Sequence, residues 1–232
     1  MLKTQTLIWT MAALLGFLNP MKSTAQDWPN LEKYREANAA LPAPTAEGNR
    51  VVFMGNSITE GWSGANPDFF NDNPYVNRGI SGQTTPQMVL RFRQDVIALD
   101  PKIVVILAGT NDIAGNTGPM TLAQIRDNIL SMVQLAKAND ISPIVCSVLP
   151  AYDYPWRPGK EPNIKIPELN GMIKEMAAQE KVMYLDYFSA MSDDRNGLPK
   201  ELTTDEVHLT KAGYAVMEKL VQEAIQTTLS KK

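Results

Sequence analysis

The chain has 232 residues, with 22 lysines and arginines, 25 aspartates and glutamates, and a formal net charge of −3. This length suits one domain with a sizeable core. A mildly acidic chain without a basic run is a poor match for nucleic acid or an anionic membrane surface, so neither is expected as a partner. Cys146 is the only cysteine, so no intrachain disulfide can form, and its apolar neighbours predict a buried, inert thiol.

Residues 1–25 have the pattern of a secretory signal peptide. Lys3 supplies positive charge, residues 7–18 are uncharged and mostly apolar, and small residues at 23–25 precede a cleavage site before Gln26. The apolar stretch is short for a membrane span, although it could remain as an N-terminal anchor. We expect export to the periplasm or the medium, with no stable membrane insertion after processing.

Five strand candidates, most of them continuous apolar runs, follow a lead-in segment at residues 26–49, which contains a short helix candidate. Continuous apolar runs are typical of strands that are buried on both faces of a parallel sheet. The predicted strands are Val51–Met54, Tyr75–Arg78, Ile103–Leu107, Ile144–Leu149 and Val182–Leu185.

Apolar residues at helical spacing lie between and after these strands, at 89–99, 125–136, 169–177 and 216–225. Strands and helices therefore alternate along the chain. This order predicts one α/β domain over residues 50–232, a three-layer α/β/α sandwich around a five-stranded parallel sheet.

Ser57, Asp205 and His208 are the first candidates for catalysis. His208 is the only histidine, so a histidine general base must be this residue, and Asp205 lies three positions before it. Ser57 lies in the sequence GNSIT at residues 55–59, where the first strand ends and a helix should begin. A serine, an acid and a histidine in this order suggest nucleophilic hydrolysis. Taken alone, Ser57 is more simply explained as a helix N-cap.

Other reaction classes are disfavoured by what the sequence lacks. The serine turn is not the nucleophile elbow of the α/β-hydrolases, which has glycine where this chain has Thr59. No phosphate-binding loop or dinucleotide fingerprint occurs. One histidine and one cysteine cannot form a zinc site of the usual kind. We therefore expect neither a metal nor a cofactor.

Two further polar, glycine-bearing turns follow predicted strands, Asn77–Thr84 and Gly109–Asp112. Each alone is an ordinary turn, but the carboxyl ends of parallel strands share one edge of a sheet, so both should lie near Ser57. With Asp205-x-x-His208, the four blocks closely resemble the SGNH/GDSL hydrolases. That family has a Gly-Asp-Ser turn, an Asn-x-x-x-Ser-Gly turn, a Gly-x-Asn-Asp turn and a final Asp-x-x-His.

The resemblance implies a flavodoxin-like fold and the chemistry of a serine esterase. Ser57 matches the nucleophile, His208 the general base, and Asp205 the carboxylate that orients the imidazole. The resemblance also implies an oxyanion hole formed by the backbone N–H groups of Ser57 and Gly82 and by the side-chain amide of Asn111. Fixed donors of this kind stabilise the charge that develops on the carbonyl oxygen.

One position departs from the family, because Asn56 stands where an aspartate usually precedes the serine. Asn56 and Trp62 beside the nucleophile, and Tyr152 and Trp156 in an irregular stretch at 150–167, are candidate substrate-binding residues. Aromatic faces can stack on sugar rings. Simpler interpretations are a partly packed Trp62 and, for the irregular stretch, a surface flap with packed aromatic residues.

The resemblance is strongest to the branch with carbohydrate acetylesterases and platelet-activating-factor acetylhydrolase-like proteins. We therefore expect hydrolysis of a small-molecule or carbohydrate ester, with a short acyl group on a polar alcohol. The alternatives are a lysophospholipase or thioesterase for longer acyl chains, and a non-catalytic carbohydrate-binding relative. The sequence does not indicate an oligomeric state.

Overall fold

The computed structural model describes residues 26–45 and 48–231, so the expected signal peptide at 1–25 lies outside the described residues. Five strands form one parallel sheet in the order β2-β1-β3-β4-β5. The strands are β1 (Val51–Gly55), β2 (Tyr75–Gly79), β3 (Ile103–Leu107), β4 (Ser142–Cys146) and β5 (Met183–Leu185). The predicted five-stranded parallel sheet is confirmed, and its strand order is that of flavodoxin-like folds.

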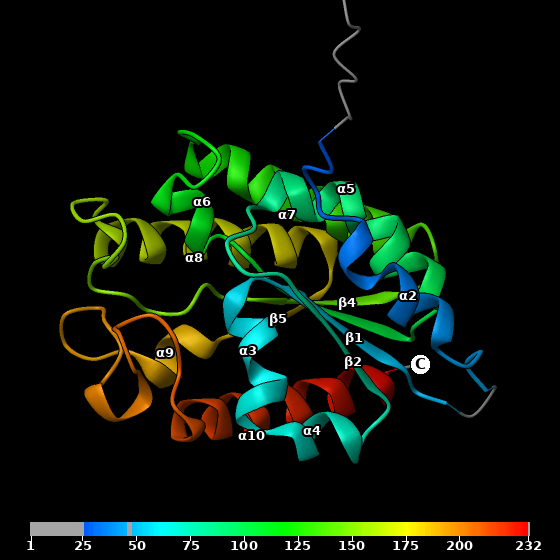
Figure 1. The fold of residues 1–232 in the computed structure, drawn as a ribbon. Coiled ribbons are helices and arrows are strands. Elements are labelled where there is room, and N and C mark those ends of the chain that lie inside the picture. Colours follow the sequence, from blue (N-terminus) through cyan, green and yellow to red (C-terminus); the bar gives the residue numbers. More distant parts are fainter. Residues whose placement is uncertain (1–25, 46–47, 232) are drawn as a thin grey trace, which may run out of the picture.

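Helices cover both faces of the sheet, as Figure 1 shows. One layer contains α2 (Glu32–Ala40), α5 (Thr85–Asp95), α7 (Leu122–Lys137) and α8 (Pro162–Glu180). The other contains α3 (Ser57–Ala65), α4 (Pro67–Asn71), α9 (Tyr187–Met191) and α10 (Lys211–Leu229). Shorter elements are α6 (Thr110–Ala114), η2 (Ile97–Leu99) and η3 (Lys200–Leu202). The predicted three-layer sandwich is therefore confirmed.

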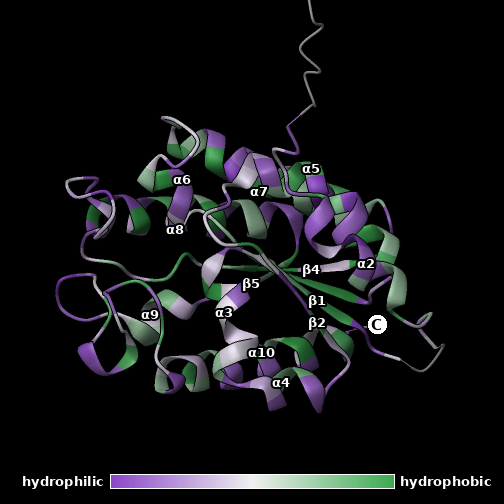
Figure 2. Cartoon of the chain, in the orientation of Figure 1, coloured by the Kyte–Doolittle hydropathy of each residue, from purple (hydrophilic) through white to green (hydrophobic). Residues whose placement is uncertain are grey.

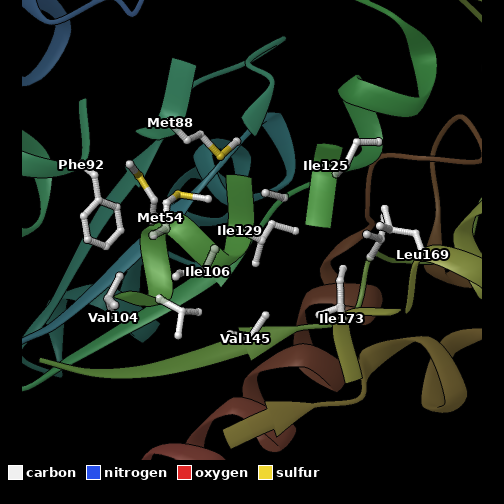
Figure 3. Close-up of a cluster of buried hydrophobic side chains, with 14 of the residues drawn as sticks. Met54, Met88, Phe92, Val104, Ile106, Ile125, Ile129, Val145, Leu169 and Ile173 are labelled. Carbon is white, nitrogen blue, oxygen red and sulfur yellow. The ribbon is translucent and has the colours of Figure 1, made fainter. Parts of the chain in front are cut away.

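Both faces of the central strands are buried, which explains their continuous apolar sequences. Alternate residues of a strand point to opposite faces. Met54 and Ile106 join the core beneath α5, α7 and α8, which Figure 3 shows. Phe53 and Val105 join the core beneath α3, α4 and α10. Figure 2 shows the apolar strands between helices that are largely hydrophilic on their outer sides.

The fourth strand is shorter than predicted, because regular pairing ends at Cys146 rather than at Leu149. Residues 147–149 are nevertheless buried. Asn170 of α8 supplies hydrogen bonds to Val148, whose N–H donates to Asn170 Oδ1 at 2.7 Å and whose carbonyl accepts from Asn170 Nδ2 at 3.0 Å. The side chain of Asn170 thus provides the hydrogen bonds that the backbone of Val148 would otherwise need from a neighbouring strand.

Helix α8 begins at Pro162, so the second part of the stretch predicted to be irregular is helical. Proline favours the first helical turn, which suits Pro162, but Pro167 lies inside the helix and has no N–H. The carbonyl that Pro167 leaves unpaired is that of Asn163, four residues earlier. Asn196 Nδ2 donates to this carbonyl at 3.0 Å, so a neighbouring loop compensates for the proline.

The lead-in segment packs directly on the sheet layer through α2. Asn38 Nδ2 donates to Asp95 Oδ1 at 2.8 Å, and Arg78 Nε donates to Asn38 Oδ1 at 2.7 Å. Tyr34 also donates to the carbonyl of Gly79 at the end of β2. The polar side chains of the lead-in therefore bond to the edge of the sheet where the candidate catalytic turns lie.

Arg91 of α5 is fully buried and holds two of those turns together. Its guanidinium donates to Asp95 Oδ2 at 3.0 Å, to Gln83 Oε1 at 2.5 Å and to the carbonyl of Gly55 at 3.0 Å. Burial lowers the pKa of Arg91, and the charge of Asp95 opposes that shift. The buried charge is tolerated because it is paired and its N–H groups find acceptors.

Replacing Arg91 with methionine should lower the free energy of unfolding by about 3–5 kcal/mol, because Asp95 would lose its buried charge partner. Urea denaturation followed by circular dichroism measures this change. Arg93→Met on the exposed side of the same helix is the matched control and should change stability by less than about 0.5 kcal/mol. Equal losses in the two variants would contradict the role of Arg91.

Candidate active site

Ser57 is the first residue of α3, immediately beyond the carboxyl end of β1. The N-cap of α3 is Asn56, whose Oδ1 accepts from the N–H of Ile58 at 3.1 Å. Asn56 is only 1% exposed, so its amide serves the turn and is closed to substrate. The hydroxyl of Ser57 is therefore not needed as a cap and is available for another partner.

Ser57, His208 and Asp205 form one hydrogen-bonded chain. Ser57 Oγ lies 2.9 Å from His208 Nε2, and His208 Nδ1 lies 2.7 Å from Asp205 Oδ2. An ionised carboxylate can only accept, so the Nδ1–H of the neutral imidazole donates to Asp205. Nε2 is then free to accept the proton of Ser57, which is the protonation state that a general base requires.

The backbone around Asp205 holds the imidazole in this position. Asp205 Oδ1 accepts from the N–H groups of Val207 at 3.0 Å and His208 at 2.7 Å. Glu206, which lies between Asp205 and Val207, has φ of 69°, a left-handed conformation that is strained for a non-glycine residue. The side chain of Thr203 also donates to the carbonyl of His208 at 2.9 Å. The tight turn thus fixes both the carboxylate and the ring.

The pKa of Asp205 is lowered from its usual value. Partial burial acts to raise it, but hydrogen bonds from the imidazole of His208 and from the N–H groups of His208 and Val207 outweigh burial. The carboxylate is therefore ionised at neutral pH and can stabilise a positive charge on His208.

The three candidate oxyanion donors follow three neighbouring strands, β1, β2 and β3. Ser57 lies in the first turn of α3, where its N–H has no acceptor within the helix. Gly82 is exposed, with φ of 76°, a conformation that favours glycine. Asn111 is 3% exposed and donates one amide hydrogen to the carbonyl of Gln83 at 3.0 Å. The oxyanion role of these three donors stays a prediction.

Trp62 does not line a pocket, contrary to one interpretation of the sequence. It is 1% exposed and stacks between Phe69 at 5.0 Å and Tyr214 at 5.5 Å between ring centroids. Its Nε1 donates to Glu218 at 2.9 Å, so even the polar end of the ring has a partner. Trp62 is a core residue because α3 turns that side of the helix onto α4 and α10.

Trp156 lies beside the candidate base, whereas Tyr152 packs elsewhere. The ring of Trp156 is 39% exposed, stacks on Tyr154 at 5.0 Å and lies 6.4 Å from the imidazole of His208. Tyr152 is 44% exposed, and the guanidinium of Arg195 lies 4.9 Å over its ring. In Figure 1 the yellow-green segment after β4 and the orange segment before α10 lie at the same side of the molecule.

Several residues of the site were missed from the sequence. Glu60 accepts from the backbone N–H of Ser81 at 2.6 Å and pairs with Lys33. Gln83 and Asn116 bond to the turns that carry the candidate donors. Gln83 was inside a motif that the sequence pointed to, but nothing in the sequence distinguished Asn116 from other loop asparagines.

Asp112, next to Asn111, is a buried carboxylate with one unsatisfied oxygen. Oδ1 accepts from the N–H and the hydroxyl of Thr85 at 2.8 and 2.6 Å. Oδ2 and the hydroxyl of Tyr154 are both buried and lack a hydrogen-bond partner among the described residues. Burial raises the pKa of Asp112 to about 6, although the bonds from Thr85 oppose the shift.

Asp112→Asn should stabilise the protein at alkaline pH. The folded-state pKa lies above the unfolded value of 3.8, so wild-type stability falls as the pH rises through about 4 to 6. The stability difference between Asp112→Asn and wild type should grow by about 1 kcal/mol from pH 5 to pH 8. Urea denaturation at the two pH values measures it. The exposed Asp194→Asn is the control, and a difference that does not vary with pH would contradict the shift.

A cavity of about 710 Å³ lies far from Ser57, at the amino ends of β4 and β5. Its walls include Pro143, Val182 and Tyr184, together with lysines from the ends of neighbouring helices. The candidate triad is at the opposite, carboxyl edge of the sheet. In open α/β sheets ligands bind at that carboxyl edge, so we place the candidate active site at the triad rather than in this cavity.

A half-buried serine, an imidazole and a carboxylate bonded in series at the carboxyl edge of a sheet are the parts that serine hydrolases use. The sequence profile of the GDSL-like lipase/acylhydrolase family matches residues 53–216. The chain belongs to this family, as its four blocks predicted. None of the helices within residues 26–45 and 48–231 combines the length and apolarity needed to cross a membrane.

Three similar proteins illustrate the relationship. A GDSL-like lipase from Bacteroides thetaiotaomicron VPI-5482 is 47% identical in sequence, with a TM-score of 0.84 over 86% of this chain and 98% of that structure. An acetylxylan esterase from Xylanibacter ruminicola is 22% identical over 81% of this chain. An isoamyl acetate-hydrolyzing esterase from Saccharomyces cerevisiae is 25% identical over 66% of this chain and 68% of its own length. The match spans less than half, 45%, of the acetylxylan esterase.

Proposed function

We propose that this protein is a serine esterase that hydrolyses a short acyl group, acetyl in the first place, from a carbohydrate or another polar alcohol. The observation that carries this proposal is the chain of hydrogen bonds from Ser57 Oγ to His208 Nε2 and from His208 Nδ1 to Asp205. A serine hydroxyl is a weak nucleophile until a base accepts its proton, and His208 is placed to do so.

In the proposed reaction Ser57 Oγ attacks the ester carbonyl while its proton passes to His208 Nε2. The tetrahedral intermediate collapses, and His208 returns the proton to the departing alcohol. Ser57 then carries the acyl group as an ester. Water, deprotonated by His208, attacks this acyl-enzyme, and His208 then returns that proton to Ser57 Oγ as the bond to the acyl group breaks, which releases the carboxylic acid. The Asp205 carboxylate stabilises the imidazolium in both halves of the reaction.

The negative charge on the carbonyl oxygen would be stabilised by the N–H groups of Ser57 and Gly82 and by the amide of Asn111. Such donors act strongly because they are oriented before the substrate arrives. The geometry supports this role, since Asn111 is held by Gln83 and the Gly82 turn is bonded to neighbouring elements. Removal of one donor of this kind typically costs two to three orders of magnitude in rate.

Three observations favour a small acyl group on a polar alcohol. Two of the relatives are named for the hydrolysis of acetate esters. The exposed ring of Trp156 beside His208 offers an aromatic face for the alcohol part, such as a sugar ring. The cavity of about 710 Å³ is lined by residues remote from Ser57, so it offers no site for an acyl chain bound to that serine.

Export is part of the proposal and rests on the signal-peptide pattern of residues 1–25. An exported esterase meets extracellular or periplasmic carbohydrates, which suits the proposed substrate class. Cleavage before Gln26 would leave the lead-in segment and its contacts to the sheet edge intact.

Ser57→Ala should abolish hydrolysis, with kcat falling by about four to six orders of magnitude, because the nucleophile is lost. Initial rates on 4-nitrophenyl acetate measure the loss. The thermal midpoint should stay within a few degrees of wild type, and Ser131→Ala on α7 is the matched control. A wild type that hydrolyses no ester but binds oligosaccharides would instead support the carbohydrate-binding alternative.

Acyl preference can be read from 4-nitrophenyl esters of increasing length, from acetate to decanoate. We expect kcat/KM to be highest for acetate and to fall steadily with chain length, because a long chain would have to lie outside the site in water. The measurement is kcat/KM of the wild-type protein, with each ester kept below its critical micelle concentration. A rise of kcat/KM towards decanoate would favour the lysophospholipase or thioesterase alternative.

A further inference from the structure

Asn116, in the loop between α6 and α7, contacts three separate parts of the candidate active site. Its backbone N–H donates to the carbonyl of Asn111 at 3.1 Å. Its Nδ2 donates to the carbonyl of Gly82 at 3.2 Å. Its Oδ1 accepts from Nε1 of Trp156 at 3.2 Å. One residue thus joins two of the three residues that carry candidate oxyanion donors to the aromatic ring beside His208.

Gly82 depends on hydrogen bonds for its position, because it has no side chain to pack. A Cβ at Gly82 would meet no atom within 4 Å, and the residue is exposed. The flanking residues are held from elsewhere, Ser81 by Glu60 and Gln83 by Arg91. Asn116 is the residue whose side chain bonds to Gly82 itself. Its amide therefore restrains the peptide between Gly82 and Gln83, whose N–H also donates to the carbonyl of Ile80 at 3.3 Å. Through the Cα of Gly82 this restraint limits the orientation of the candidate donor N–H, which lies on the preceding peptide.

Trp156 has a similar need for an anchor. It lies in an irregular segment, and its ring rests on Tyr154 with an angle of 26° between the planes. Stacking fixes the plane of the indole but leaves it free to turn within that plane. The bond from Nε1 to Asn116 Oδ1 sets that rotation and keeps the ring 6.4 Å from the imidazole of His208.

We propose that Asn116 is a positioning residue that sets the distance and angle between the alcohol-binding face of Trp156 and the oxyanion donor at Gly82. This inference rests on the proposed esterase function and adds to it a specific basis for recognition of the alcohol. A substrate has its carbonyl and its alcohol part separated by a fixed covalent distance. An error of about 1 Å between the two binding elements can cost about a hundredfold in rate.

The two side-chain bonds of Asn116 can be removed separately. Asn116→Asp keeps an acceptor for Trp156 but replaces the donor to Gly82 with an oxygen, which repels the carbonyl. Trp156→Phe keeps an aromatic ring but removes the N–H that Asn116 accepts. Asn116→Ala removes both bonds. Asn139→Ala is the matched control, because Asn139 Nδ2 bonds to the carbonyl of Leu135 at 2.8 Å, at the far end of α7.

The experiment measures kcat and KM of each variant on glucose pentaacetate and on 4-nitrophenyl acetate, with thermal midpoints to verify folding. We expect Asn116→Asp to lower kcat by about tenfold on both esters with little change in KM, the effect of losing one hydrogen bond. Trp156→Phe should mainly raise KM, by about fivefold or more, and only for the sugar ester. Asn116→Ala should combine both losses, and Asn139→Ala should match wild type.

The outcomes separate the two proposals. If wild type hydrolyses both esters and the folded Asn116 variants stay within twofold of it in kcat and KM, the positioning role is wrong while the esterase function stands. The same conclusion holds if Trp156→Phe, which does not alter Asn116, shows no selective loss on the sugar ester. If wild type hydrolyses neither ester nor any other, both proposals fall together.

Discussion

The guanidinium of Arg91 donates to Asp95 on its own helix, to Gln83 in the turn after β2, and to the carbonyl of Gly55 at the end of β1. Removing such a charge from water costs several kcal/mol, and only complete pairing offsets that cost. Its acceptors must therefore be present together. Because two of them belong to different turns, a buried charge in the helix layer links the first two candidate catalytic blocks to each other.

The rest of the candidate site extends from this buried group by hydrogen bonds. Gln83 accepts from Arg91 with its side chain and from Asn111 with its carbonyl, so the third block is linked to the first two. Asp205 and His208 reach the same edge on a separate loop whose left-handed residue is strained. Fixed donors and a fixed base need no rearrangement when a charge develops, which is the condition for electrostatic catalysis.

Sequence reasoning succeeded where local physics decides the outcome and failed where a distant group intervenes. Continuous apolar runs located the central strands β1, β3 and β4, because burial on both faces leaves little room for polar residues. The end of β4 was placed too late, because Val148 is as apolar as a strand residue while its backbone bonds to Asn170. Trp62 was a candidate substrate-binding residue because it follows the nucleophile closely in the chain. Its packing against α4 and α10 could not be predicted from that position.

The sequence by itself determined the layered α/β fold, the family and the identity of the candidate base, since a chain with one histidine leaves no alternative. It also indicated the serine and the carboxylate through their place in short motifs. Only the tertiary structure brought Ser57 within 2.9 Å of His208 and placed Trp156 against the same imidazole. It also linked Gly82, Asn111 and Trp156 through Asn116. Local patterns report periodicity and turn chemistry, whereas these contacts join residues far apart in the chain, and their geometry depends on how the loops at the sheet edge pack together.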